Sequence, residues 1–359
     1  KEKDAIYTYH FYHLLQRAKN IYLLYNADSE GFDAGEKSRF ITQLEVEKQP
    51  NHNLTFQYFN PDVPNIAYQP MVVPKTDSVL TRLQEIASNG FSPSSLTTYI
   101  RNPIQFYLQR VLRISETDEV EENIAANTLG TIIHGTLEEL YKPFIGRLLT
   151  TADIESCFQK IDAEVLRQFK EVYKEGEIKK GRNLLAFEVA KRNVFNFLKL
   201  EKEALEDGDQ VQIIALEQTY ERVLEDHRLA VPVLIKGNVD RIELRNGKIR
   251  IIDYKTGKVE QKNVTLKDWK GLTEDIKNDK IIQILAYAFM FEQETKGLEM
   301  EAGIISFKNL NAGFLPFTFK PEKEASTVIN ADVMEAYLEE IVVLLQTIFN
   351  QEIPFEEKI

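Results

Sequence analysis

The residues best suited to chemistry lie in one short stretch of the chain, from Gly237 to Lys255. Asn246-Gly247 separates two runs in which apolar and polar residues alternate. This pattern predicts a tight β-hairpin, because both turn residues tolerate positive φ. A two-residue turn fixes the register of the strands, so Asp240 is expected to face Asp253 directly across the hairpin.

Alternation places Asp240 and Asp253 at the end of the apolar face of this hairpin, with Lys255 on the same side. Carboxylates that face each other across a ladder have Cβ atoms about 5 Å apart, and like charges there are destabilising. Either one acid is protonated or a cation lies between them, and hard divalent ions such as Mg²⁺ or Mn²⁺ prefer oxygen ligands. The competing interpretation is that both acids are ordinary strand ends, solvated or paired with Arg241 and Lys255.

The elements that must position this hairpin follow from hydrophobic periodicity. Ser92-Pro93 predicts a helix start, and Pro103 predicts the end of that helix near Arg101. The other predicted helices cover 103–112, 129–141, much of 151–206, 281–291 and 331–349. The predicted strands cover 212–220, 229–236, 238–254 as the hairpin, 303–307 and 314–319, with a charged loop at 257–279.

Residues 4–60 are typical of a small separate α/β unit. We expect strands at Ile21–Tyr25 and Leu54–Phe59, a polar turn from Asn26 to Lys37 and a helix at Ser38–Glu47. Regular structure then breaks at a series of prolines, Pro61, Pro64, Pro70 and Pro74. The sequence thus predicts two domains, 1–88 and 89–359.

The composition excludes several classes of protein. The chain has 359 residues, 43% of them hydrophobic, which is enough for two packed cores and argues against disordered or fibrous proteins. Cys157 is the one cysteine, so no internal disulfide can form and a reducing, cytoplasmic location is expected. No apolar stretch approaches the roughly 18 residues of a membrane span. Because the first residue is Lys1, we expect a piece of a longer protein.

The net charge of −12 argues against a uniformly basic surface that coats nucleic acid. The balance reverses between Arg241 and Lys262, where seven basic residues stand against three acidic ones. A local basic groove therefore remains compatible with the acidic chain.

The motifs of the hairpin, Gly-x-x-Asp-Arg-x-Glu and Ile-Ile-Asp-Tyr-Lys-Thr-Gly, resemble the core of the PD-(D/E)xK nuclease superfamily, most closely the RecB and AddB C-terminal nuclease domain. Three further features follow the order of that family. They are Ser92–Leu96 through Pro103, His134 in Leu-Gly-Thr-Ile-Ile-His-Gly, and the Gln-x-x-x-Tyr pair Gln283 and Tyr287. The resemblance covers about residues 91–359 and implies an α/β fold with a central mixed β-sheet and flanking helices.

The resemblance also implies a metal-dependent DNA nuclease, and more specifically an exonuclease acting on DNA ends or single strands. The implied ligands of Mg²⁺ or Mn²⁺ are His134, Asp240, Asp253 and the main-chain carbonyl of Tyr254. Lys255 would position the attacking water or stabilise charge on the phosphate. Taken alone, His134 could be an ordinary core histidine, and Gln283 with Tyr287 an ordinary helical face rather than part of the catalytic site. Glu217, on the preceding strand, is expected to be at most a supporting group.

One departure from the family concerns iron. Many members of this branch carry a cysteine before the proline of the opening helix and three more near the C-terminus, which together bind a [4Fe–4S] cluster. Here that position is Asn102, and residues 354–359 contain no cysteine. Since a cluster needs about four thiolates, no iron–sulfur cluster is expected and packing must hold the domain instead.

The segment Leu14–Leu23 resembles the last conserved segment of UvrD-like helicase domains, although Gln16 stands where threonine is expected. No Gly-x-x-x-x-Gly-Lys-Ser/Thr loop occurs, so the motor function is not expected here. We expect residues 1–88 to be the tail of a helicase-like domain in an AddB-like DNA-repair and recombination protein with a helicase/nuclease partner subunit and no membrane contact. The alternative function is a catalytically silent nuclease fold that binds DNA or a partner subunit.

Overall fold

The computed structural model describes residues 2–25, 37–47, 50–58, 68–114, 124–173, 180–321 and 324–358. Contacts between residues divide the chain into two compact units, Lys1–Tyr68 and Gln69–Ile359. This division lies before the sequence-based boundary at residue 88. The reason is helix α3 (Asp77–Asn89), which buries Leu83 and Ala87 in the core of the second unit.

The described part of the first unit contains the helices α1 (Glu2–Leu15) and α2 (Arg39–Val46). The rings of Phe11 and Phe40 stack between them at 4.9 Å. The strands predicted at 21–25 and 54–58 are wrong, since both segments are irregular and pair with no described strand. A strand without a partner gains no ladder hydrogen bonds, so an apolar run alone does not make one. Phe59 and residues 26–36 of the predicted turn lie outside the described residues.

The second unit is built on a mixed β-sheet. Among the described residues, five strands form this sheet in the order β2-β3-β4-β6-β7, with β4 and β6 parallel and the other neighbours antiparallel. The strands are β2 (Val211–Leu224), β3 (Val233–Arg245), β4 (Lys248–Lys255), β6 (Met300–Ser306) and β7 (Phe314–Pro316). A small ribbon joins β5 (Thr265–Leu266) to β8 (Thr318–Phe319). The fold class expected from the sequence is thus confirmed.

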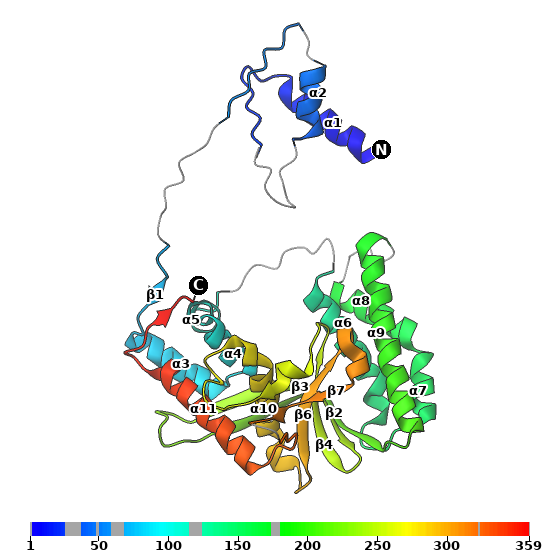
Figure 1. Cartoon of the computed structure of the whole chain (residues 1–359), viewed down its shortest axis with the longest axis vertical. Helices are drawn as coiled ribbons and strands as arrows, with labels where there is room; N and C mark the ends of the chain where they lie inside the picture. Colours follow the sequence, from blue (N-terminus) through cyan, green and yellow to red (C-terminus); the bar gives the residue numbers. More distant parts are fainter. Residues whose placement is uncertain are drawn as a thin grey trace. The chain divides into compact units, whose positions relative to one another are not determined.

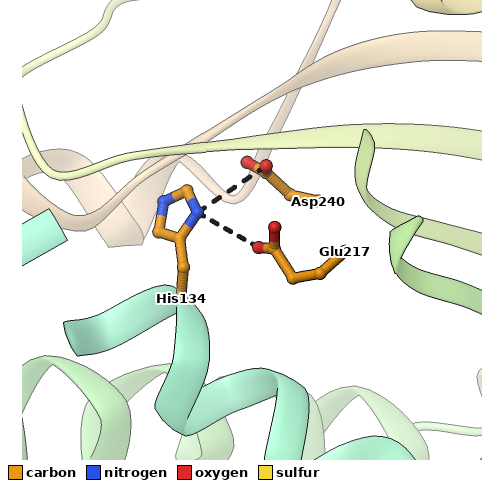
Figure 2. Close-up of side chains that lie close together, drawn as sticks. All are labelled: His134, Glu217 and Asp240. Carbon is orange, nitrogen blue, oxygen red and sulfur yellow. Dashed lines mark ion pairs between the residues drawn. The ribbon is translucent and has the colours of Figure 1, made fainter. Parts of the chain in front are cut away.

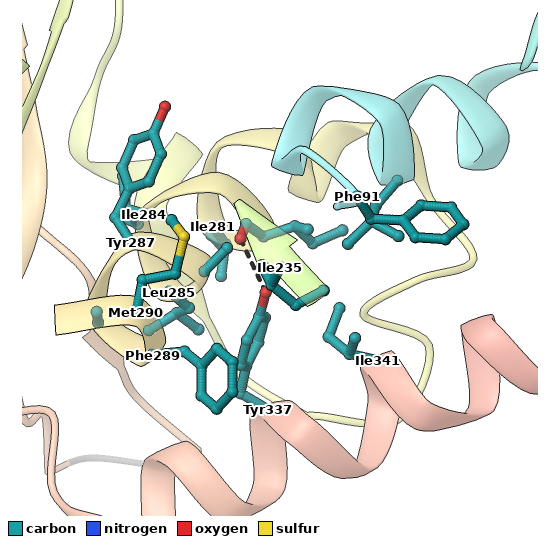
Figure 3. Close-up of a cluster of buried hydrophobic side chains, with 14 of the residues drawn as sticks. Phe91, Ile235, Ile281, Ile284, Leu285, Tyr287, Phe289, Met290, Tyr337 and Ile341 are labelled. Carbon is teal, nitrogen blue, oxygen red and sulfur yellow. Dashed lines mark hydrogen bonds between the residues drawn. The ribbon is translucent and has the colours of Figure 1, made fainter. Parts of the chain in front are cut away.

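Two layers of helices cover this sheet, one on each face (Figure 1). The first layer contains α3, α4 (Pro93–Arg101), α5 (Pro103–Phe106) with the π-turn 107–111, α10 (Asp279–Phe291) and α11 (Ala331–Phe349). The second layer contains α6 (Ala126–Tyr141), α7 (Thr151–Phe158), α8 (Ile161–Tyr173) and α9 (Gly181–Glu206). Figure 3 shows the core of the first layer, where the Tyr337 hydroxyl donates to the Ile282 carbonyl at 3.1 Å.

The predicted hairpin register is confirmed from Arg245 opposite Lys248 to Arg241 opposite Ile252. Upstream, β3 is one continuous strand where the sequence suggested two, and β2 extends four residues beyond Tyr220, to Leu224. The long β2–β3 pairing explains both differences, because each strand completes the hydrogen bonds of the other over its whole length.

The charged side of the hairpin is buried rather than solvated. Arg241 and Glu243 are 0% and 1% exposed and lie beneath α9. Arg241 Nη1 pairs with Glu201 of that helix at 2.9 Å, and Arg245 pairs with both Glu201 and Glu243. The sequence-level idea that Arg241 pairs with a nearby acid is confirmed, and both faces of the sheet are interior.

The two ends of the second unit are tied together near the C-terminus. Strand β1 (Val72–Val73) pairs with β9 (Phe355–Glu356). Burial lowers the pKa of Lys75 to about 8, and its ammonium donates to the carbonyls of Thr347 at 2.8 Å and Asn350 at 3.2 Å. Asn102 accepts the Ile104 N–H and thereby begins α5. Ordinary hydrogen bonds and packing therefore hold this corner.

No helix among the described residues combines the length and the apolar character that crossing a lipid bilayer requires.

We expect Lys75→Ala to lower the free energy of unfolding by about 1–3 kcal/mol, because it removes two buried hydrogen bonds and the packing of the lysine stem. Urea denaturation measures this, with Lys308→Ala, a change at an exposed lysine, as the control. Equal midpoints for the two variants would show that the Lys75 contacts do not stabilise the fold.

Candidate metal centre

Asp240 marks the point where the two strands of the hairpin separate. The ladder between β3 and β4 ends at Arg241 and Ile252, one pair before the expected pairing of Asp240 with Asp253. The Asp240 carboxylate itself accepts the Tyr254 N–H, with 2.6 Å between Oδ2 and the nitrogen. The Asp240 side chain thus accepts the hydrogen bond that a main-chain carbonyl of β3 would accept in a continuous ladder. Its other oxygen, Oδ1, faces His134.

His134 lies on α6, a helix of the second layer, and its side chain points toward Asp240. Its Nδ1 lies 3.6 Å from Asp240 Oδ1 and 3.3 Å from Glu217 Oε1 (Figure 2). These three side chains form a group whose potential ligand atoms all lie within 4.8 Å of one another. The structure therefore brings together two residues that the sequence singled out and one, Glu217, that it treated only as a supporting group.

Glu217 reaches the group through an unusual backbone conformation. It has φ of 43° within β2, which is rare for a residue with a side chain and costs on the order of 1–3 kcal/mol. The register of β2 and β3, with Leu216 opposite Arg241 and Gln218 opposite Val239, leaves Glu217 opposite Asp240. No tight turn joins β2, which ends at Leu224, to β3, which begins at Val233, so the sequence does not fix this register in advance.

The electrostatics of the group favour a cation. Burial and the nearby charge of Asp253 raise the pKa of Asp240 to about 7. Burial by itself lowers the pKa of His134, but the contact with Glu217 and the charge of Asp240 outweigh burial and raise it. Asp240 and His134 thus both hold a proton more tightly than usual. Such raised pKa values are expected where several negative charges lie close together in a buried site.

Asp253 and Lys255 form an ion pair beside this group. Lys255 Nζ lies 2.7 Å from Asp253 Oδ2 and donates to Gln283 Oε1 at 3.0 Å. Gln283 Nε2 in turn donates to the Tyr287 hydroxyl at 2.7 Å. Burial by itself lowers the pKa of Lys255, but the charge of Asp253 outweighs it and raises the pKa. Gln283 and Tyr287 therefore reach the site through Lys255.

The basic residues along 241–262 are paired with acidic side chains. Each of its seven basic residues pairs with an acid, often from another element: Arg241 and Arg245 with Glu201 and Glu243, Lys248 with Glu299, Arg250 with Glu301, Lys255 with Asp253, and Lys258 and Lys262 with Glu260. The local charge reversal seen in the sequence is balanced in the fold.

The sequence matches the profile of a known protein family. The profile of the PD-(D/E)XK nuclease superfamily matches residues 90–358, which is well over half of the chain. The chain belongs to this superfamily. Its acid pair and lysine, which resemble the motif of that superfamily, are Asp240, Asp253 and Lys255, and all three lie at the same end of the hairpin.

Relatives of this superfamily member include one of the subunits of the ATP-dependent helicase/deoxyribonuclease of Streptococcus agalactiae, from serotypes Ia, V and III. Each is 24% identical over 211 residues, which cover 57% of this chain and 17% of the relative. The chain therefore matches only a small part of these longer proteins. A solved structure of SSO0001 is 16% identical to this chain, and the match covers 70% of this chain and 85% of SSO0001. Its TM-score of 0.19 is too low to show a shared fold.

Three motifs of this superfamily member meet at Gly237. A Cβ atom at this glycine would lie 3.1 Å from Tyr287 Cε1, 3.1 Å from Met290 Cε and 3.3 Å from Pro93 Cδ. The glycine therefore allows the Tyr287 ring to pack directly on β3. This packing fixes the tyrosine whose hydroxyl holds Gln283 against Lys255.

We expect Gly237→Ala to lower the free energy of unfolding by about 1–3 kcal/mol, because the added methyl group overpacks the contact with Tyr287 and Pro93. Chemical denaturation measures the loss. The matched control is Gly257→Ala, where a Cβ would meet no atom within 4 Å. A stability of Gly237→Ala equal to that of this control would contradict the proposed packing role.

Proposed function

We propose that this chain is a divalent-metal-dependent deoxyribonuclease that hydrolyses phosphodiester bonds. The observation that carries the proposal is the convergence of His134 Nδ1 and the Asp240 carboxylate beside the Asp253–Lys255 pair. One imidazole nitrogen and several carboxylate oxygens suit Mg²⁺ or Mn²⁺. Membership of the nuclease superfamily supports the same reaction class.

In this proposal His134, Asp240, Asp253 and the main-chain carbonyl of Tyr254 hold the ion. The position of the carbonyl follows from the hydrogen bond of the same residue. Within a strand the N–H and the C=O of one residue point to the same side, and the Tyr254 N–H points to Asp240. When bound, a divalent ion at such a site polarises the phosphate and lowers the pKa of a water.

The protein's own groups would do the rest of the work. The Lys255 ammonium, held by Asp253 and Gln283, would lie next to the bound phosphate and stabilise the negative charge that develops during hydrolysis. Tyr287 would keep Gln283 in place through their 2.7 Å hydrogen bond. Gln283 and Tyr287 are thus positioning residues for the lysine.

The finer biological role rests on the relatives. Their name makes them a subunit of an ATP-dependent helicase/deoxyribonuclease, although the match covers only 17% of their length. We propose that the chain acts as an exonuclease on DNA ends or single strands, within an AddB-like DNA-repair and recombination protein that works with a helicase/nuclease partner subunit. The first unit, residues 1–68, would be the helicase-like tail of that protein. The buried free thiol of Cys157 supports a reducing, cytoplasmic location.

We expect Asp253→Ala to reduce Mg²⁺-dependent digestion of end-labelled linear DNA by about a hundredfold or more, because it removes a proposed metal ligand that also holds Lys255. Circular dichroism should show a folded protein. Asp162→Ala, a change at an exposed aspartate of α8, is the control and should digest DNA at the wild-type rate.

Wild-type digestion by Asp253→Ala would refute the proposed catalytic site. The alternative, a catalytically silent fold that binds DNA or a partner subunit, makes a different prediction. In that case the wild-type chain neither takes up Mn²⁺ in calorimetric titration nor digests DNA in Mg²⁺.

A further inference from the structure

We propose that Glu217 is an additional ligand of the divalent ion, and that Asn238 holds its carboxylate in the orientation that binding requires. This inference rests on the proposed function, because it concerns the same site. It adds a third element, β2, to the helix and hairpin that supply the other ligands.

Glu217 and Asp240 are held in the same way. Glu217 Oε2 accepts a hydrogen bond from Asn238 Nδ2 at 2.6 Å, just as Asp240 Oδ2 accepts one from the Tyr254 N–H at 2.6 Å. In both acids the second oxygen is the one that faces His134 Nδ1, at 3.3 Å for Glu217 and 3.6 Å for Asp240. Hydrogen bonds that fix one oxygen and aim the other are typical of oriented metal ligands.

The second oxygen of Glu217, Oε1, has the His134 imidazole as its partner, 3.3 Å away. It is buried and accepts no hydrogen bond from the described residues apart from its contact with the imidazole. An imidazole nitrogen that binds a metal carries no proton, so His134 Nδ1 could not donate to Oε1 in the metal-bound site. A carboxylate oxygen buried without a donor is costly, so the cation itself is the natural partner of Oε1. Lys255, which lies beside Asp253, is already engaged by Asp253 and Gln283.

Asp253, the acid of the superfamily motif, is bound to the lysine. Both of its oxygens lie within 3.0 Å of Lys255 Nζ. In this arrangement the carboxylate that faces His134 together with Asp240 is that of Glu217, on the neighbouring strand. Glu217 would therefore let the ion bind while Asp253 still holds the catalytic lysine.

The test is calorimetric titration of Mn²⁺ into the full chain, with no DNA present. We expect Glu217→Gln to weaken Mn²⁺ binding by about tenfold or more, and Asn238→Ala to weaken it by a smaller factor because the carboxylate remains but is no longer held. Glu221→Gln changes an exposed glutamate of the same strand, which pairs only loosely with Lys236 at 3.5 Å, and should bind Mn²⁺ like the wild type.

Thermal unfolding without metal provides the second readout. Glu217→Gln removes one of several like charges in the site, so its metal-free Tm should equal or exceed that of the wild type, while its gain in Tm on adding Mn²⁺ should shrink. A role limited to structure would instead lower the metal-free Tm and leave the Mn²⁺ affinity unchanged.

If Glu217→Gln and Asn238→Ala bind Mn²⁺ as tightly as the wild type, Glu217 is only the ion-pair partner of His134 and the inference is overturned, while the proposed nuclease site stands. If the wild-type chain binds no Mn²⁺, the inference and the proposed function fall together.

Discussion

Several carboxylates gathered in a buried site cost free energy unless positive charge enters with them. Glu217, Asp240 and Asp253 create this constraint at the open end of the β3–β4 hairpin, where His134 and Lys255 are the described cationic partners. Much of the second unit can be understood as the means of holding these groups together. The sheet fixes the acids, the second helix layer brings the imidazole, and α10 holds the lysine through Gln283.

Successive side chains of β3 point to opposite faces of the sheet, and this alternation serves both the site and the stability of the sheet. Asp240 points into the site, while the next residue, Arg241, points to the opposite face and pairs with Glu201 and Glu243. Breaking a buried pair of this kind typically costs about 3–5 kcal/mol, so the strand that carries Asp240 is anchored by its neighbour. At the far corner, Lys75 and the β1–β9 ribbon join the two ends of the unit by hydrogen bonds and packing.

The parts that sequence predicts well are those governed by local rules. The Asn246-Gly247 turn fixes the hairpin register, and Ser92 caps its helix as its side chain allows. Glu217 is harder to find, because its positive φ and the irregularity of β2 between Ile213 and Ala215 depend on contacts made by the folded sheet. The pairing of the basic residues, the burial of the charged face and the placement of α3 with the second unit likewise depend on partners that are distant in sequence.

If the acids and His134 together hold a divalent ion, that ion can be located directly. Anomalous diffraction from crystals of the chain soaked in Mn²⁺ is the most direct measurement, because it finds the ion without reference to activity. We expect a strong anomalous peak within coordination distance of His134 Nδ1 and Asp240 Oδ1, about 2.0–2.3 Å from each. The absence of any peak at saturating Mn²⁺, or a peak elsewhere with His134 still paired to Glu217, would contradict a metal centre at this site.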